Sequence, residues 1–172
     1  MTDPLLDERY TQAIGTPDLK SLPDKLANIY RTWEDLRGVR AMPAFEELGW
    51  DALPPSIVSW CSLVDVVQYP LDFIYRYWGE KRTELMARTT RGYPFSISDP
   101  LSFPTRYYKE YVTLMERRAP ISITTFGMGM NQDESYSFLR LPFGKDECIE
   151  QVLSISGATT PRFKNSKNTW TD

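Results

Sequence analysis

The sequence predicts an α+β domain with five antiparallel strands, on the basis of three observations. Residues 60–79 are rich in β-branched and aromatic side chains around a break at Pro70 and Asp72, a pattern typical of a β-hairpin. Residues 23–37 and 104–118 carry apolar side chains at helical spacing. Three more strand-like segments follow the second of these helices, so helices and strands are grouped rather than alternating. This grouping indicates the α+β class.

The first helix is expected at residues 23–37, with Ser21 as its N-cap and Gly38 at its end. Its apolar side chains recur every three or four residues, at Leu22, Leu26, Ile29, Tyr30, Trp33 and Leu36. Such a stripe packs either on the domain's own sheet or against a second copy or another partner. In the second case the contact would use Leu26, Ile29, Tyr30 and Trp33.

The hairpin at residues 60–79 supplies the first two strands. Because side chains alternate along a strand, its second arm is expected to turn alternate residues to opposite faces. One face would receive Phe73, Tyr75 and Tyr77, and the other Ile74, Arg76 and Trp78. Neither set is simply polar, so both faces of the sheet are expected to be covered.

Short helices flank the hairpin. One is expected at residues 44–50 and a charged one at residues 80–88, followed by an irregular stretch at 89–104 that is rich in glycine and proline. The helix at residues 104–118 carries apolar side chains around much of its circumference, so we expect it to be substantially buried.

The last three strands are expected at residues 121–128, 134–142 and 148–156, where β-branched and apolar residues alternate with polar ones. Turn-forming residues separate them at 131–134 and 143–146. Together with the hairpin, these segments complete the predicted five strands.

A chain of 172 residues fits one domain, expected at residues 21–156, with a flexible lead-in at 1–20 and a flexible tail at 157–172. The N-terminus has no signal-peptide pattern, and no apolar run reaches the ~20 residues that cross a bilayer. The net charge of −3 predicts no nucleic-acid surface. We therefore expect a cytoplasmic protein that contacts neither membrane nor nucleic acid, with Cys61 and Cys148 as buried free thiols.

The absence of histidine narrows the chemistry most sharply. It removes histidine general acid–base catalysis, Ser-His and Cys-His nucleophile pairs, and haem ligated by histidine. Two separated cysteines do not build a structural zinc site either. No metal site is expected, and most common enzyme mechanisms are unavailable.

The order of elements, together with a set of short motifs, resembles a PAS domain. The motifs are Trp33 with Arg37, Met42-Pro43, Leu63-Val64-Asp65-Val66, Phe73-Ile74-Tyr75-Arg76-Tyr77-Trp78-Gly79, Tyr111, Arg118-Ala119-Pro120 and Leu139-Arg140-Leu141-Pro142. Over residues 26–156 the chain is most similar to a bacterial PAS-like family of single-domain proteins, long catalogued as a domain of unknown function.

The resemblance implies a non-enzymatic sensory or regulatory module in signal transduction. Its curved sheet and intervening short helices would enclose a small molecule, and its N-terminal helix would cover the other face or form a homodimer. The resemblance brings no catalytic residues. Output would pass through that dimer or through a separate signalling protein.

Known PAS cofactors require particular residues in the sequence. Haem bound through histidine is excluded, and a flavin of the LOV kind needs a cysteine in an Asn-Cys-Arg-Phe-Leu-Gln motif that neither cysteine has. The cofactor is therefore unknown. The domain either binds an unidentified ligand or is empty and serves for contacts.

Aromatic residues and two arginines are the candidates for a ligand pocket, because such pockets combine apolar walls with a few polar groups. The candidates are Tyr75, Arg76, Tyr77, Tyr108, Phe126 and Arg140. The alternative is that the aromatics form core and the arginines pair with Asp65, Glu147 or Glu150. A second functional hypothesis is a small cone-shaped α+β enzyme, an isomerase or hydratase, with a buried Asp65 as base and a tyrosine as proton donor.

Overall fold

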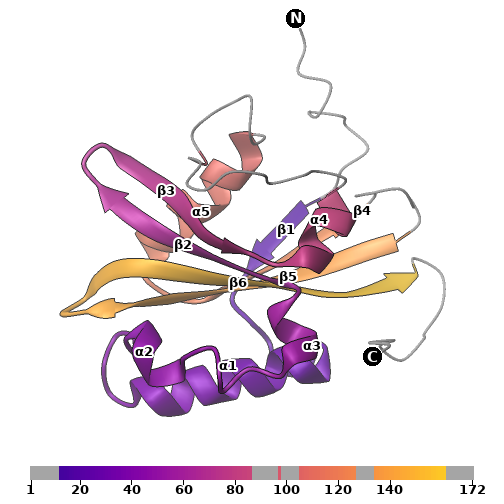
Figure 1. Cartoon of the computed structure of the whole chain (residues 1–172), viewed down its shortest axis with the longest axis horizontal. Coiled ribbons are helices and arrows are strands. Elements are labelled where there is room, and N and C mark those ends of the chain that lie inside the picture. The colour runs from indigo at the N-terminus through magenta and orange to yellow at the C-terminus, as the bar shows by residue number, and fades with distance from the viewer. Residues whose placement is uncertain (1–11, 87–96, 98–104, 127–133, 162–172) are drawn as a thin grey trace, which may run out of the picture.

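Six antiparallel strands form one twisted sheet at the centre of the computed structural model, which describes residues 12–86, 97, 105–126 and 134–161 (Figure 1). Their order across the sheet is β1 (Gln12–Gly15), β4 (Ile121–Phe126), β5 (Glu134–Lys145), β6 (Cys148–Pro161), β2 (Cys61–Gln68) and β3 (Leu71–Trp78). The predicted hairpin is confirmed as β2 and β3, and the α+β class with it.

Helices cover both faces of this sheet. On one face lie α1 (Asp24–Arg37), α2 (Phe45–Leu48) and α3 (Pro55–Val58), drawn below the sheet in Figure 1. On the other face lie α4 (Glu80–Met86) and α5 (Thr105–Arg117). The helices predicted at residues 23–37 and 104–118 are confirmed as α1 and α5, and those at 44–50 and 80–88 appear in shorter form as α2 and α4.

The sheet has six strands where five were predicted, because β1 lies in the predicted lead-in. This strand of four residues pairs with β4, with Gln12 opposite Thr125 and Ile14 opposite Ile123. Its own sequence, Gln-Ala-Ile-Gly, is too short to show strand alternation, so the pairing partner defines it. The predicted boundary at residue 156 is also too early, since β6 continues to Pro161.

The face of the sheet that α1 covers is packed with apolar side chains. Directly paired residues of neighbouring strands share a face, so the register places Leu141 of β5 beside Leu153 of β6 there. The ring of Phe143 meets that of Phe45 of α2 at 5.3 Å between centroids. All four side chains are buried. This layer is therefore an ordinary hydrophobic core.

A β-bulge changes the predicted faces of β3. The register of β2 against β3 shifts between Leu63 and Val64, so that Tyr77 pairs with Leu63 while Tyr75 pairs with Val64. An extra residue in one strand breaks the alternation beyond it. As a result Trp78 joins Tyr75 on the face of α4 and α5, and Tyr77 turns to the opposite face. The prediction that Tyr75 and Tyr77 share a face is wrong.

Candidate functional site

The face covered by α4 and α5 holds polar side chains where a core would ordinarily be apolar. We call them the buried polar cluster, and its members are Ser62, Arg82, Glu110, Tyr111, Arg140, Ser154 and Ser156. The strand register generates three of these positions, since Ser62 of β2 is opposite Ser154 of β6, which is opposite Arg140 of β5. Side chains paired in this way lie about 4.5–5.5 Å apart at Cβ. The three therefore form a continuous polar row across the sheet.

Arg140 is the most fully bonded member of the cluster. Its Nη2 forms an ion pair with Glu110 of α5, and its Nη1 donates to Tyr111 Oη at 2.9 Å and to Ser154 Oγ at 2.5 Å. Burial alone lowers the pKa of Arg140, but the neighbouring Tyr111 and Glu110 together raise it by more. The pKa is therefore above its usual value. Arg140 is thus a charged side chain whose countercharge lies in direct contact.

Arg82 of α4 is equally buried but is bonded differently. Only 1% of this residue is exposed. Its Nη1 donates to Ser156 Oγ at 2.9 Å, and its guanidinium carbon lies 4.7 Å from the centre of the Trp78 ring. Among the residues that the structure describes, no carboxylate forms an ion pair with it. A serine and an aromatic face orient this cation without neutralising it.

Within the part of the chain that the structure describes, three buried polar atoms of the cluster have no hydrogen-bond partner: Ser62 Oγ, Arg82 Nε and Arg140 Nε. Buried donors in native proteins are nearly always paired, and leaving one unpaired costs about 1–3 kcal/mol. All three groups are able to donate, and all three belong to the same face of the sheet. The cluster is therefore short of acceptors.

The charge balance of the cluster points the same way. Two arginines face one glutamate. Burial raises the pKa of Tyr75 well above its usual value, so this tyrosine supplies no negative charge near neutral pH. One positive charge remains without a counterion in the described part of this interior, an arrangement that is costly in a medium of low dielectric constant.

The predicted pocket residues are divided between the two faces. Tyr75 and Arg140 lie on the polar face, and Tyr108 of α5 borders it, with its hydroxyl donating to the Leu71 carbonyl at 3.2 Å. Tyr77 lies on the opposite face. The side chain of Phe126 lies outside the described residues.

Arg76 lines none of the pockets that the described residues form. Its side chain is 64% exposed and forms an ion pair with Asp65, as the alternative interpretation predicted. Arg140 also pairs with a carboxylate of the chain, but the partner is Glu110 rather than Glu147 or Glu150. Asp65 accepts a further hydrogen bond from Gln151 at 2.9 Å and is partly exposed. This surface position argues against Asp65 as the buried base of an enzyme.

The four residues predicted for contact with a partner lie against the sheet of their own chain. Leu26, Ile29 and Trp33 are buried, and Tyr30 is half-buried with its ring 6.4 Å from that of Trp33. The Trp33 indole N–H donates to the Pro142 carbonyl at 2.8 Å. A partner would reach Leu26, Ile29 and Trp33 only if α1 left the sheet.

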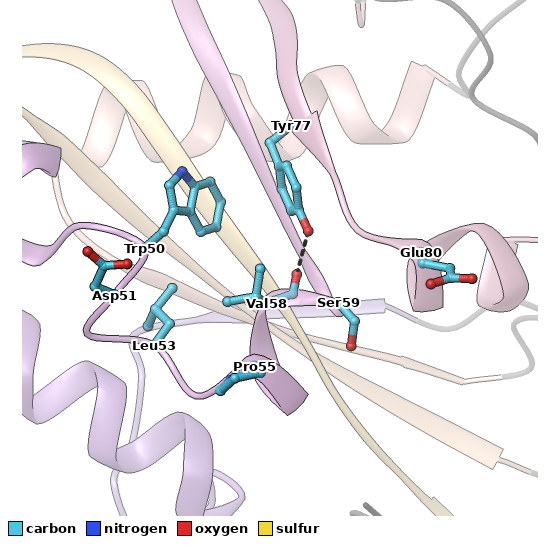
Figure 2. Close-up of a pocket in the computed structure, with 8 residues that line it drawn as sticks. All are labelled: Trp50, Asp51, Leu53, Pro55, Val58, Ser59, Tyr77 and Glu80. Carbon is cyan, nitrogen blue, oxygen red and sulfur yellow. Dashed lines mark hydrogen bonds between the residues drawn. The ribbon is translucent and has the colours of Figure 1, made fainter.

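A separate pocket of about 500 Å³ opens on the opposite side of the sheet, at the edge made by β3 (Figure 2). Its lining residues are Trp50, Asp51, Leu53, Pro55, Val58, Ser59, Tyr77 and Glu80. Tyr77 lies on the wall, with its hydroxyl donating to the Val58 carbonyl at 3.3 Å. The ring of Trp50 is 4.6 Å from that of Tyr77. The only charged side chains in the lining are acidic, so this pocket offers an anion no cation.

Sequence reasoning missed Arg82 and Glu110. Arg82 lies in the run Glu-Lys-Arg-Thr-Glu, which resembles a solvated helix face. Glu110 did carry a signal, because it lies three residues after Tyr107 and four before Leu114, within the apolar stripe of α5. A carboxylate inside such a stripe calls for a buried cation.

Comparisons of the chain with protein-family models, with curated proteins and with solved structures found no match. Within the described part of the chain, no group of three or more histidine, cysteine or acidic side chains is arranged to hold a metal ion. Among the described helices, none combines the length and the apolar character that crossing a bilayer requires.

Proposed function

We propose that this protein is a non-enzymatic sensory or regulatory module that binds a small molecule at the buried polar cluster. The observation that carries the proposal is the set of three buried donors on one face of the sheet that have no acceptor among the described residues. A bound molecule that accepts hydrogen bonds would satisfy them and would offset the cost of burying them. The likeness of the sequence to PAS-like domains favours the same role.

In this proposal, ligand binding changes how α1 is held on the opposite face of the sheet. Arg140 and Pro142 belong to the same strand, β5, two residues apart. Arg140 is bonded within the polar cluster, and the carbonyl of Pro142 accepts the Trp33 indole N–H from α1. A ligand that shifts Arg140 would therefore act on the strand segment that holds α1.

The size of the response depends only on the difference between the affinities for two arrangements of α1. A ligand that binds both arrangements equally changes nothing, and each ~1.4 kcal/mol of difference changes their ratio about tenfold. Released or shifted, α1 would expose Leu26, Ile29 and Trp33 to a second copy of the chain or to a separate signalling protein. We expect this to take place in the cytoplasm.

Two measurements on the freshly purified full chain test the proposal. Native and denaturing mass spectra are compared, and a difference in mass identifies a molecule that is bound non-covalently. Hydrogen exchange of α1 is then recorded before and after that molecule is removed. We expect faster or slower exchange in residues 24–37. The proposal fails if no small molecule and no partner protein changes the protection of this helix.

A further inference from the structure

We infer that Arg82 is the anchor of a binding site for a small monocarboxylate. The inference rests on the proposed function, because it names the ligand class at the same cluster. It starts from the contrast between the two buried arginines. Arg140 has its carboxylate in Glu110, whereas Arg82 meets a hydroxyl and a ring face among the described residues and has no acceptor there for Nε.

The surroundings of Arg82 fix the direction of its guanidinium plane. Ser156 holds Nη1 at 2.9 Å, and the ring of Trp78 lies under the guanidinium carbon at 4.7 Å. Trp78 is held in turn, because its indole N–H donates to Thr83 Oγ1 at 3.2 Å. Nε has no acceptor among the described residues, and in this inference it is the group that meets the ligand. A carboxylate oxygen accepts from Nε–H in a charge-assisted hydrogen bond.

The charge balance selects a monoanion. Among the described residues, Arg140 and Glu110 cancel and no carboxylate forms an ion pair with Arg82, so one positive charge is left over in this part of the interior. A carboxylate with a single negative charge makes this interior neutral. A phosphate dianion would leave a net negative charge, and a neutral amide would leave the cation unpaired; each carries the cost of a buried charge.

Ser62 provides a second group on the ligand's side of the sheet. It is paired across the strands with Trp78 on one side and with Ser154 on the other, and its Oγ is buried without a partner. A hydroxyl in this position has a role as a donor to a ligand oxygen. Without a ligand it only adds the cost of an unsatisfied polar group.

The test is a titration of the full-length, ¹⁵N-labelled protein with sodium acetate at constant ionic strength, followed by the Nε–Hε signal of Arg82 in NMR spectra. Acetamide, which has the same shape without the charge, is the matched ligand control. We expect the Arg82 Hε signal to move downfield with acetate and to stay in place with acetamide. No movement with acetate, or equal movement with both compounds, overturns the inference.

Variants identify the residue and guard against loss of folding. Arg82→Lys removes Nε and the fork, so we expect acetate affinity to fall by about tenfold or more. Arg76→Lys, at an exposed arginine of β3, is the matched control and keeps the affinity. Ser62→Ala keeps Arg82 and the fold, and lowers the affinity by about threefold to tenfold. Unchanged affinity in both Arg82→Lys and Ser62→Ala overturns the inference.

The outcomes for the ligand class and for the module are separable. If acetate binds at Arg82 while no small molecule and no partner protein changes the hydrogen exchange of α1, the site is supported and the sensory role is contradicted. A neutral molecule that alters the exchange of α1 without moving the Arg82 signal supports the sensory role and contradicts the carboxylate site.

Discussion

Arg140 of β5 and Glu110 of α5 form an ion pair whose side chains are only 1% and 3% exposed. Burying both charges is costly, and their attraction offsets the cost only when the remaining polar atoms are also bonded. Tyr111 and Ser154 supply two of these bonds. The pair therefore holds α5 on the sheet and forms part of the buried polar cluster.

Removing the negative partner leaves Arg140 charged and buried. We expect Glu110→Gln to lower the free energy of unfolding by about 3–5 kcal/mol, measured by urea denaturation. Glu147→Gln is the matched control, because Glu147 pairs with Arg118 in an exposed contact at 3.6 Å and such pairs contribute about 0–1 kcal/mol. A loss below about 1 kcal/mol for Glu110→Gln would show that the pair does not contribute this much to the free energy of unfolding.

The bond from Trp33 to Pro142 makes a second prediction. Trp33→Phe keeps an aromatic ring but removes the N–H, so the buried Pro142 carbonyl loses its donor. We expect a loss of about 1–3 kcal/mol in the free energy of unfolding and faster hydrogen exchange in α1. Trp50→Phe, in the open pocket, serves as the control and leaves the exchange of α1 unchanged. Equal exchange in both variants would contradict the role of this bond.

The elements with long, regular patterns were predictable from the sequence. The apolar stripes of α1 and α5 and the aromatic arms of the hairpin are encoded locally, at spacings that one segment reveals. β1 was not predictable, because four residues that end in glycine become a strand only by pairing with β4. Here tertiary context decided the structure.

The site was predictable only in part, for two physical reasons. The first is the bulge opposite Leu63 and Val64, which separates Tyr77 from Tyr75 although their spacing predicts a common face. The second is the burial of Arg82, which depends on how α4 docks on Trp78 and Ser156 rather than on its local sequence. Arg140 could be predicted because residues 134–142 alternate, which places this arginine on the same face of the strand as Phe138.

Gly79 joins β3 to α4 and so controls where Arg82 lies. A Cβ at this position would lie 2.2 Å from the Ser59 carbonyl oxygen, closer than contact allows. We expect Gly79→Ala to lower the free energy of unfolding by about 1–3 kcal/mol and to displace α4. Gly15→Ala is the control, since a Cβ there meets nothing within 4 Å. Urea denaturation measures both variants, and equal stability of the two would contradict the prediction.

The two free cysteines are expected to differ in reactivity. Cys61 is buried, as predicted, with its thiol donating to the Ile57 carbonyl at 3.3 Å. The prediction of burial is wrong for Cys148, which is exposed at the start of β6. Only an accessible thiolate reacts readily with a disulfide reagent. At pH 8 we expect one thiol per chain to react quickly in the folded protein and two after unfolding in guanidinium. Cys148→Ala should remove the fast reaction. A fast reaction that persists in this variant would show that Cys61 is accessible.

Burial of Cys61 also predicts how stability changes with pH. Burial raises the pKa of its thiol to about 12 in the folded state, against about 8.5 in an unfolded chain. Between these values the unfolded state releases the proton and the folded state keeps it, so the free energy of unfolding falls as pH rises, by up to ~1.4 kcal/mol per pH unit. Below about pH 8.5 both states are protonated, and the thiol adds no pH dependence.

The difference in unfolding free energy between the wild type and Cys61→Ala isolates this effect, because all other titrating groups are common to both. We expect that difference to shift by about 2 kcal/mol from pH 8 to pH 10, to the disadvantage of the wild type. Cys148→Ala keeps Cys61 and should follow the wild type over the same range. If Cys61→Ala loses stability in parallel with the wild type, the thiol titrates alike in both states, and the closed packing around β2 and α3 cannot be as tight as its burial indicates.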